Sequence, residues 1–421
     1  MLVINFPYKV SFWATGNVEP TNPLGDSDIS VDILVIGAGF AGISSAYYLK
    51  KAAPDLNIAV VEAEYVGFGP SGRNFGGVTT GMRELRTSFI TGFDLEEERF
   101  AARYFLRSRD EFEKRIADGA IECEYRDEPI LMHALDADAW QTLQHESELL
   151  HQRGTPNKLL SGDEVRKALP VPYEIHGGMV LTAWRSVQPF KLVRGFADQL
   201  RGMGVAIHEA TKVSDIHDDG SRVSVTTTDR GTIKASKVVL ATNAYTYHMK
   251  PFNELLFPRQ SYVVVTVPLQ DDVFQSLGLK EFTYIEDVGM TFYYARAYKN
   301  RLLFGGGMPT KGLFSPSTVD RAADTDPIEY ERVYEEMQRR FPQLKGVSLE
   351  AAWSGPIDIT ENFAPIIRPM AGMPNVIANI GFNGEGLFAG SLSGKMVVGQ
   401  VLGSGHSDPD AERVRRYLNG N

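Results

Sequence analysis

The sequence predicts an α/β protein with two domains, one built around a mainly parallel sheet and one inserted α+β domain that contains a mostly antiparallel sheet. Three observations support this prediction. Apolar strands at 32–35 and 58–62 flank a segment with helical spacing at 42–51, which predicts a strand-helix-strand unit. Residues 376–391 repeat this pattern, with a predicted buried strand, a glycine-rich turn and the start of a helix. The segment 262–307 carries Tyr, Phe, Val and Thr at every second position, which predicts strands of another sheet.

The other predicted elements divide the chain of 421 residues between these two domains. Short antiparallel strands, with turns at Asp219-Gly220 and Arg230-Gly231, precede a buried strand at 238–241. In residues 94–118 apolar residues recur at helical spacing, and charged residues occupy the opposite face. This pattern predicts an amphipathic helix of the second domain. The expected division is a polar N-terminal arm at 1–30, a first domain at 31–85, 185–250 and 350–421, and a second domain at 86–184 and 251–349.

The composition restricts the classes of partner. A formal net charge of -10 argues against binding to nucleic acid or to an anionic membrane. The single cysteine, Cys123, excludes an intrachain disulfide and a cysteine-based metal site, and the eight histidines lack the short spacing of a zinc site, so no metal is expected. The start does not resemble a secretion signal, and no apolar run reaches the length of about 18 residues typical of a membrane helix. We therefore expect a soluble, cytoplasmic protein without a membrane partner.

A glycine motif follows the first predicted strand. It reads G-x-G-x-x-G over 37–42, between a strand and a helix, and Glu62 ends the next strand. The first glycine permits a tight turn, the second lets the backbone approach a pyrophosphate, and the third lets helix and strand pack closely. An acid at the position of Glu62 can accept hydrogen bonds from a ribose diol. The pattern predicts a Rossmann-type dinucleotide-binding domain, but it does not separate nicotinamide from flavin dinucleotides.

Six motifs follow one another along the chain: ILVIGAGFAGISSAYYL, VVEAEYVGFGPSGRNFGG, VVLATNAYT, LLFGGG, FPQLKGVSLEAAWSG and IGFNGEGLFAGSLSGK. In this order they resemble the D-amino-acid oxidase and glycine oxidase (DAO) superfamily of FAD-dependent amine oxidoreductases. The chain looks most like the gamma-glutamylputrescine oxidoreductase group, and the similarity runs from about Trp13 to Gly403. This resemblance implies a glutathione reductase-like FAD-binding domain. It also implies non-covalent FAD, since Cys123 lies outside the motifs and no histidine adjoins the SGRN segment.

The resemblance further implies which residues contact FAD. Residues 37–42 would hold the pyrophosphate and Glu62 the adenosine ribose, while 71–77 would pass along the flavin. The turn at 384–388 would lie beside the pyrimidine edge of the flavin, where a helix N-terminus stabilises negative charge. The expected cofactor-binding residues are Gly37, Ala38, Gly39, Phe40, Ala41, Gly42, Glu62, Ala63, Ser71, Gly72, Arg73, Asn74, Gly76, Gly77, Val213, Ala241, Thr242, Gly384, Glu385, Gly386, Leu387 and Phe388.

The implied reaction is oxidation of a primary or secondary amine at its C–N bond by hydride transfer to the flavin, giving an imine that hydrolyses to an aldehyde or ketone. The expected partners are a small-molecule amine and oxygen or another electron acceptor. Leu303 stands where the sarcosine branch has a lysine linked to oxygen activation, so the acceptor stays open. One alternative is an amino-acid oxidase or dehydrogenase. A different one is a flavin-binding subunit without independent turnover.

Candidate substrate-pocket residues lie in the predicted second sheet. A period of two places Tyr284 with Glu286 on one face, and Phe292 and Tyr294 with Arg296 on one face. Aromatic rings can surround an amine, and Arg296 could hold a distant carboxylate. An ordinary half-buried sheet would show the same aromatic pattern, so the two interpretations stay open.

Three further candidates come from the later motifs. Glu385 could attract an ammonium group or tune its protonation, although a solvated loop glutamate explains it equally well. Phe388 occupies a position where sarcosine-oxidising relatives carry a carboxylate-binding lysine, which favours an amine over a simple α-amino acid. Trp353 matches a tryptophan of the superfamily, and a structural core role is the stronger interpretation for it.

Overall fold

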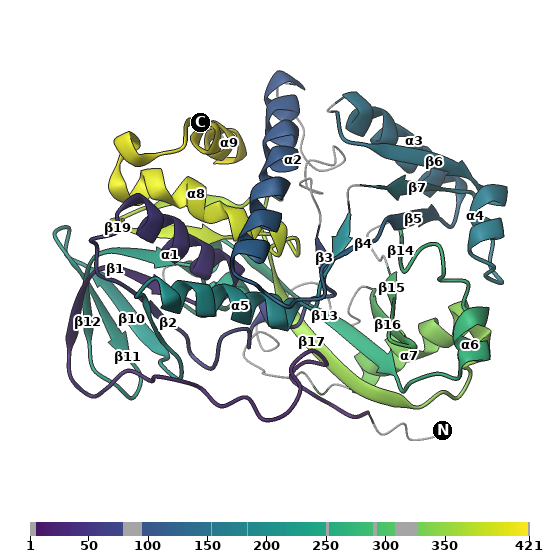
Figure 1. The fold of residues 1–421 in the computed structure, drawn as a ribbon, viewed down its shortest axis with the longest axis horizontal. Helices are drawn as coiled ribbons and strands as arrows, with labels where there is room; N and C mark the ends of the chain where they lie inside the picture. The colour runs from purple at the N-terminus through teal and green to yellow at the C-terminus, as the bar shows by residue number, and fades with distance from the viewer. Residues whose placement is uncertain are drawn as a thin grey trace.

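The computed structural model describes residues 6–78, 95–152, 154–182, 184–249, 252–288, 293–307, 325 and 327–419. Two large sheets stand side by side in Figure 1, one at the left and one at the right. This arrangement confirms the predicted α/β fold with a second, mostly antiparallel sheet. Among the described helices, none combines the length and apolar character needed to cross a membrane.

The first sheet is built on five parallel strands. In spatial order they are β9 (Ala206–His208), β2 (Ile58–Val61), β1 (Ile29–Ile36), β12 (Ile233–Leu240) and β19 (Met373–Ile380). Antiparallel partners extend it: β18 (Ile366–Met370) on β19, and the hairpin of β10 (Val213–Asp218) and β11 (Val223–Thr227) on β12. The predicted strands at 32–35, 58–62, 238–241 and 376–379 are thus strands of one sheet.

The two faces of this sheet have different covers, because successive side chains of a strand point in opposite directions. Ile33 and Val35 pack with helices α1, α5 and α8, whereas Leu34 and Ile36 pack on the side of the β10–β11 hairpin. The helices of the first face are α1 (Phe40–Ala52), α2 (Leu95–Asp118), α5 (Pro189–Gly202), α8 (Phe388–Leu402) and α9 (Pro409–Asn419). Figure 1 shows α1, α5 and α8 along this face.

The second sheet has eight strands in the order β17-β13-β16-β15-β14-β5-β7-β6. All neighbours are antiparallel except β14 and β5. Its strands are β5 (Ile130–Ala134), β6 (Asn157–Ser161), β7 (Gly177–Leu181), β13 (Phe257–Thr266), β14 (Tyr284–Asp287), β15 (Tyr293–Tyr298), β16 (Arg301–Gly306) and β17 (Leu349–Ile359). The helices beside it are α3 (Ala137–Gln152), α4 (Gly162–Ala168), α6 (Asp271–Ser276) and α7 (Pro327–Arg340).

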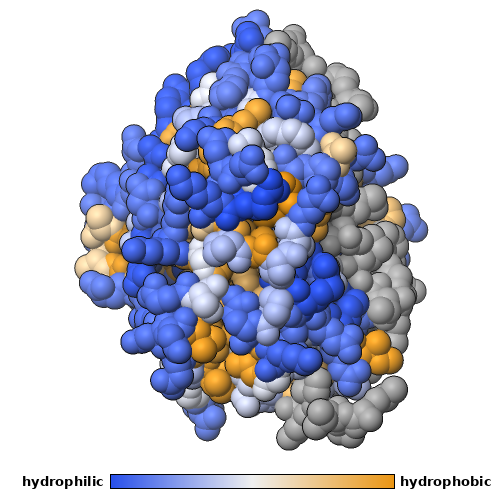
Figure 2. Space-filling view, turned by 90° about the vertical axis from the view of Figure 1, so that its right-hand side faces the viewer, coloured by the Kyte–Doolittle hydropathy of each residue, from blue (hydrophilic) through white to orange (hydrophobic). Residues whose placement is uncertain are grey.

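The described residues also form a small sheet and several short 3₁₀ helices. The small sheet consists of β3 (Gly77–Val78), β8 (Arg185–Ser186) and β4 (Arg126–Asp127). The 3₁₀ helices are η1 (Pro70–Gly72), η3 (Asn243–His248), η4 (Phe252–Glu254), η6 (Pro342–Leu344) and η7 (Ser404–His406). The face at the right of Figure 1 is mainly hydrophilic in Figure 2, with separate apolar patches.

The structure corrects the expected division at two places. The helix predicted at 94–118 is present as α2, but its Phe112 ring lies 5.3 Å from the ring of Phe388, within the core of the first domain. Strand β17 pairs along β13 in the second sheet, so residues 350–359 do not belong to the first sheet. Helical spacing or strand alternation identifies an apolar face, but it does not identify which domain covers that face.

The N-terminal arm is more closely packed than its polar composition indicates. Phe6, Trp13 and Leu24 are buried, and a β-bridge joins Tyr8 to Ala352 of β17. Since these contacts reach both sheets, the arm is part of the folded structure and not a loose linker.

Candidate cofactor and substrate site

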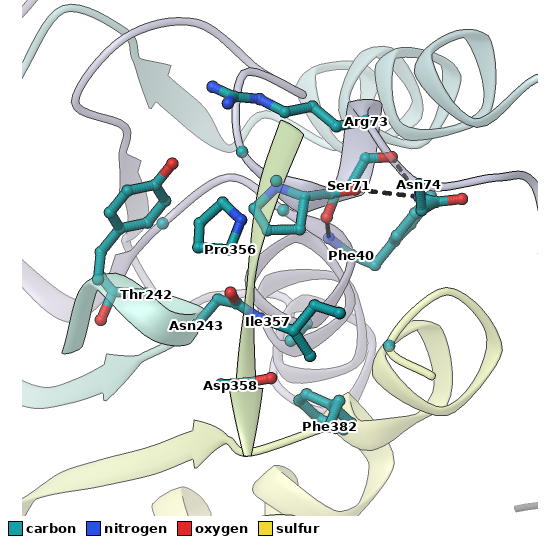
Figure 3. A pocket seen from close by; sticks show the side chains of 18 of the residues that line it. Phe40, Ser71, Arg73, Asn74, Thr242, Asn243, Pro356, Ile357, Asp358 and Phe382 are labelled. Carbon is teal, nitrogen blue, oxygen red and sulfur yellow. Dashed lines mark hydrogen bonds between the residues drawn. The ribbon is translucent and has the colours of Figure 1, made fainter. Parts of the chain in front are cut away.

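A cavity of about 770 Å³ lies between the two sheets. Its wall includes the glycine turn after β1, the loop at 67–77, the end of β12, the cavity-facing parts of β13 and β17, and the turn at 382–387. Figure 3 shows part of this wall, with Phe40, Ser71 and Asn74 opposite Pro356, Ile357 and Asp358 of β17. One cavity therefore joins the nucleotide-binding motifs to the second sheet.

The glycine turn leaves no room for side chains where it meets its neighbours. A Cβ on Gly37, whose φ is +102°, would lie 2.5 Å from the carbonyl oxygen of Ala241. A Cβ on Gly42 would lie 1.9 Å from the carbonyl oxygen of Gly37, which is backbone that cannot move aside. Gly37 and the following residues to Ala41 line the cavity, while Gly42 lies behind them and lets α1 pack against the turn.

Ser71 ties the loop after β2 to the start of α1. Its Oγ accepts a hydrogen bond of 3.0 Å from the backbone N–H of Phe40, as the dashed line in Figure 3 shows. A Cβ on Gly39 would lie only 2.7 Å from this same oxygen. The two segments expected to contact the cofactor are thus fitted to each other, which sequence spacing alone does not reveal.

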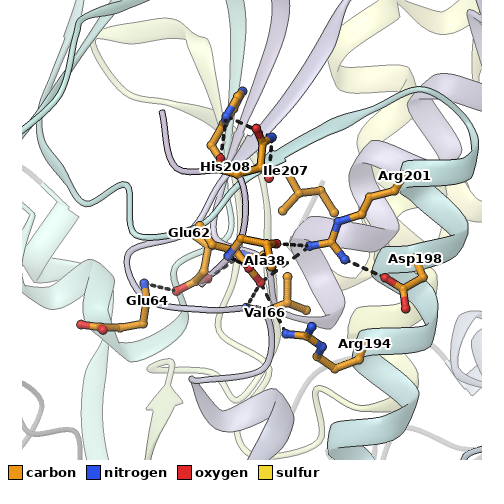
Figure 4. Close-up of polar contacts among 12 residues, drawn as sticks. Ala38, Glu62, Glu64, Val66, Arg194, Asp198, Arg201, Ile207 and His208 are labelled. Carbon is orange, nitrogen blue, oxygen red and sulfur yellow. Dashed lines mark hydrogen bonds and ion pairs between the residues drawn. The ribbon is translucent and has the colours of Figure 1, made fainter. Parts of the chain in front are cut away.

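Glu62 lies beside the glycine turn at the end of β2 and lines the cavity. Its carboxylate accepts hydrogen bonds from the backbone N–H groups of Ala38 at 2.9 Å and Glu64 at 3.2 Å (Figure 4). Desolvation raises the pKa of Glu62 above its usual value, and these two N–H groups act in the opposite direction. The backbone bonds fix the carboxylate next to the turn, where a ribose hydroxyl can reach it.

Glu209 is a buried acid that was not predicted from the sequence, and it holds the loop that follows Glu62. Glu209 accepts hydrogen bonds from the backbone N–H of Val66 at 2.7 Å and from the hydroxyl of Thr21 at 2.6 Å. Arg194 and Arg201, which are both labelled in Figure 4, lie 3.6 and 3.7 Å from its Oε1. Glu209 therefore connects the arm, α5 and the loop that follows Glu62.

The SGRN loop is held by hydrogen bonds from several elements. The side chain of Arg73 is buried, and it donates to the carbonyl oxygens of Phe68 at 2.6 Å and Ser354 at 3.2 Å. The indole N–H groups of Trp353 and Trp13 donate to the carbonyl oxygens of Arg73 at 2.9 Å and Asn74 at 2.8 Å. Trp353 also lines the cavity, so it both shapes the wall and positions the loop.

The turn before α8 is attached to β17 by a buried carboxyl group. Oδ2 of Asp358 accepts a hydrogen bond of 2.5 Å from the backbone N–H of Gly381, and its carbonyl oxygen accepts one of 3.0 Å from the N–H of Asn383. Burial raises the pKa of Asp358 to about 7, against the effect of these backbone N–H groups. Asp358 lines the cavity and was not among the predicted site residues.

Aromatic side chains from the second sheet and from two neighbouring segments form one wall of the cavity. The ring of Phe75, in the SGRN loop region, lies 4.5 Å from that of Tyr294 and 5.4 Å from that of Tyr284. Trp184 completes this group, with its ring 5.1 Å from Tyr284. The hydroxyl oxygens of Tyr294 and Ser261 are 3.0 Å apart, and burial raises the pKa of Tyr294 to about 12, so the phenol stays neutral.

Most of the predicted residues line this cavity. Among the expected cofactor residues these are 37–41, Glu62, Ala63, Ser71, Arg73, Asn74, Gly77, Val213, Ala241, Thr242 and 384–387, and among the substrate candidates Tyr284, Tyr294, Trp353 and Glu385. Gly72 and Gly76 belong to the same loop but do not line the cavity, and a Cβ on them would meet the carbonyl oxygens of Gly67 at 2.0 Å and Val187 at 2.2 Å. Phe292 lies outside the described residues.

Three substrate candidates are placed away from the cavity. Arg296 is buried and donates to the carbonyl oxygens of Phe75 at 2.8 Å and Val187 at 3.0 Å, so its guanidinium holds backbone and is not available as a substrate clamp. Phe388 packs under α2 in the core, and Glu286 is fully buried in β14 without lining the cavity. The sequence predicted the strand or turn in which each of these three residues lies. It did not predict their packing partners, which come from distant parts of the chain and keep the three side chains out of the cavity.

Arg259 of β13 lines the cavity and was also missed. It shares a period-two pattern with Ser261 and Val263, which line the cavity too, as does the intervening Gln260. This alternation is a signal in the sequence, but it is weaker than the aromatic pattern of 284–296.

The cavity fits FAD on the grounds of its own residues. The turn excludes side chains where a pyrophosphate must approach, and Glu62 is fixed beside it as a hydrogen-bond acceptor. The same cavity continues to the turn at 384–387 before α8, and to an aromatic wall where a flavin ring can lie. Among the described residues, no group of three or more His, Cys, Asp or Glu side chains is arranged to hold a metal.

Comparison with known proteins agrees with this assignment. A relative from Escherichia coli (strain K12), gamma-glutamylputrescine oxidoreductase, is 28% identical over 95% of this chain and 88% of its own length. Among solved structures, L-proline dehydrogenase from P. horikoshii has a TM-score of 0.72 at 19% identity and covers 94% of this chain and 99% of its own. Glycine oxidase from Bacillus cereus has a TM-score of 0.69 at 20% identity, with coverages of 89% and 95%. These two structures share the fold.

The family model described as FAD dependent oxidoreductase (DAO) matches residues 32–400, which span both sheets and every wall of the cavity. The chain belongs to the DAO family of FAD-dependent oxidoreductases.

Proposed function

We propose that this enzyme uses FAD to oxidise a primary or secondary amine at its C–N bond. The observation that carries the proposal is the shared cavity, in which the cofactor-binding turns of the first sheet face the aromatic wall of the second. The amine carbon would lose a hydride and its nitrogen a proton, and water would hydrolyse the resulting imine to an aldehyde or ketone. The similarity to gamma-glutamylputrescine oxidoreductase supports an amine as the substrate.

The protein's own part is to bind, orient and shield. Bound FAD supplies the two-electron acceptor. The SGRN loop, fixed by Trp353 and by its own Arg73, presents one wall to the reacting carbon, and Tyr284, Tyr294 and Trp184 present the other. Because Tyr294 stays a neutral phenol bonded to Ser261, it can orient an amine by hydrogen bonding but does not act as a base near pH 7.

Three further features belong to the proposal. FAD is bound without a covalent link, since Cys123 is buried and is not part of the cavity wall. The electrons leave to oxygen or to another acceptor. A cytoplasmic location is consistent with the unpaired Cys123, because disulfides are rare in that compartment.

The test is a reductive titration of the purified protein. Its visible flavin spectrum is recorded, and the protein is then mixed anaerobically with a panel of alkylamines, N-methylated amines and α-amino acids. We expect bleaching by amines, whereas bleaching by α-amino acids alone would support an amino-acid oxidase or dehydrogenase. If no compound of the panel bleaches the flavin, the result would support a flavin-binding subunit without independent turnover. Admission of oxygen afterwards separates an oxidase, which regains colour rapidly, from a dehydrogenase.

A further inference from the structure

Asp358 is a buried carboxyl group of the cavity wall that has no cationic partner. It lies on β17, its side chain is fully buried, and it lines the cavity near Phe382 (Figure 3). Its Oδ2 accepts the backbone N–H of Gly381, whereas its Oδ1 has no hydrogen-bond partner among the described residues. A buried carboxylate with a free oxygen is unfavourable as an anion, so added negative charge nearby will readily protonate it.

The charged groups around Asp358 do not neutralise it. Asp358 pairs with Pro258 of β13, so the next residue, Arg259, points to the opposite face of the sheet. The other titratable groups of the neighbouring segments that line this cavity are Arg73, Tyr245, His248 and Glu385. In the described part of the chain, none of these side chains forms a hydrogen bond or an ion pair with Asp358. Burial, opposed only by backbone N–H groups among its main causes, therefore raises the pKa of Asp358 to about 7.

The turn before α8 holds Asp358 near the N-terminus of that helix. The carboxylate accepts a hydrogen bond from the N–H of Gly381, and the carbonyl oxygen of Asp358 accepts one from the N–H of Asn383. Residues 384–387 line the cavity, and the first turn of α8 has neither an acidic residue nor a side-chain cap. The positive end of the helix dipole therefore favours negative charge in this part of the cavity.

Reduction of FAD would bring such a charge into the cavity. The glycine turn after β1 fits the pyrophosphate, so the flavin ring belongs farther along the cavity, where the turn before α8 and the aromatic wall lie. A hydride adds two electrons and one proton to that ring, so reduction adds one negative charge. A negative charge close to a carboxylate raises the pKa of that carboxylate. Reduction should therefore draw a proton onto Asp358.

We propose that Asp358 takes up one proton when FAD in this cavity is reduced. Two electrons and one proton go to the flavin, and a second proton converts the Asp358 carboxylate to the carboxylic acid. An amine that becomes an imine releases the same number, because the hydride carries two electrons with one proton and the nitrogen loses the other proton. The inference requires bound FAD, but it does not require an amine as the source of the electrons.

The test measures the midpoint potential of bound FAD at intervals from pH 6 to pH 9, with dithionite as the reductant and reference dyes of known potential. The proteins are wild type, Asp358→Asn and the control Glu385→Gln, which removes the other acid of the same turn. Each proton taken up with two electrons changes the equilibrium 10-fold per pH unit, which corresponds to about 30 mV. We expect the wild-type potential to fall by about 60 mV per pH unit over a window of about one unit or more above pH 7.

Asp358→Asn should fall by about 30 mV per pH unit over the whole range, because it cannot take up the second proton. The amide oxygen of the new side chain can still accept from Gly381, so FAD content should be unchanged. Glu385→Gln should keep the steeper window. Equal slopes in wild type and Asp358→Asn would overturn the proposal, and so would a window that is lost in Glu385→Gln but kept in Asp358→Asn.

An infrared measurement detects the proton directly. The reduced-minus-oxidised difference spectrum of the wild-type protein at pH 8 should gain the C=O band of a protonated carboxyl group, and Glu385→Gln should keep this band. If Asp358→Asn loses FAD, the wild-type protein still decides, because a slope of about 30 mV per pH unit throughout, or no such band, overturns the proposal.

The electrons come from dithionite, so this result is independent of the substrate. If no amine reduces the wild-type protein but the steeper window is present, the proposed amine oxidation fails while the proton uptake by Asp358 stands. If amines reduce the protein and the window is absent, the proton uptake fails while the amine oxidation stands.

Discussion

The contact between Gly39 and Ser71 gives a quantitative test of the cofactor cradle. In Gly39→Ala the new Cβ would lie 2.7 Å from Ser71 Oγ, closer than such atoms approach in proteins, so the hydroxyl must turn away. The bond of 3.0 Å from the N–H of Phe40 to this oxygen is then lost. A hydrogen bond at a helix start contributes about 1 kcal/mol, and the strained contact adds to this cost. We expect the free energy of unfolding of the apoprotein to fall by about 2 kcal/mol.

A double-mutant cycle isolates this contact. Ser71→Ala alone should cost about 1 kcal/mol through the lost bond to Phe40. In the double variant Gly39→Ala/Ser71→Ala the clashing oxygen is absent, and the remaining Cβ–Cβ distance of 3.7 Å is an ordinary contact. The double variant should therefore be no less stable than Ser71→Ala, which means a coupling energy of about 2 kcal/mol between the two sites.

Urea unfolding of the apoproteins measures the cycle, and quenching of FAD fluorescence gives the Kd of each variant. Gly25→Ala is the control, because no atom lies within 4 Å of its Cβ position and its φ is not in the left-handed region. We expect FAD affinity to fall in Gly39→Ala and to stay unchanged in Gly25→Ala. Additive costs in the cycle, or full FAD affinity in Gly39→Ala, would refute the packing of this turn against the SGRN loop.

Three other substitutions test residues around the cavity. Asp358 holds its proton more tightly in the folded apoprotein, with a pKa of about 7, than in the unfolded chain, so its contribution to stability falls as pH rises from about 4 to 7. Apo Asp358→Asn should therefore gain about 3 kcal/mol relative to wild type between pH 5 and pH 8 in urea unfolding, and parallel pH profiles would contradict this. Arg296→Met should lower the free energy of unfolding by about 2–4 kcal/mol, because two buried carbonyl oxygens lose their donor; wild-type stability would show that these bonds are dispensable. Phe388→Ala should cost about 3–5 kcal/mol by leaving a cavity beside Phe112, with KM unchanged in any folded fraction; a raised KM at normal stability would place Phe388 at the substrate after all.

The parts of the site that could be predicted from the sequence are those fixed by local backbone geometry. In the turn at 37–42 the positive φ of Gly37 and the close approach of Gly42 to the carbonyl oxygen of Gly37 are local requirements, so the glycine spacing predicts the turn. The contacts of this turn with Ala241 and Ser71 join distant segments and could not be predicted in the same way. Glu62 directly follows a strand of four buried residues, Ile58–Val61, and this short apolar run can be identified in the sequence. Such features depend on neighbours in sequence, which is why they are readable before the fold is known.

The parts that could not be predicted depend on which distant segment covers a given face. The apolar stripe of α2 was recognised, but only the folded chain shows that it packs on the ring of Phe388. Glu209 is one acid among many in the sequence, and its role follows from Thr21 and Val66 meeting it in space. Periodicity determines the face of a helix or strand, while coverage is decided by tertiary packing.

The two arginines of the second sheet show this limit within a single sheet face. Arg296 shares that face with Tyr294, as predicted, but its register partner Leu303 pairs with Val265, at the end of β13 opposite to Arg259. At that end Trp13 of the arm and the carbonyl oxygens of Phe75 and Val187 cover the guanidinium. At the level of Arg259, six residues back along β13, the same face borders the cavity and offers no acceptor among the described residues. The acceptors that surround each guanidinium, and not its position in the strand pattern, therefore decide which arginine holds backbone segments and which one is left facing the cavity.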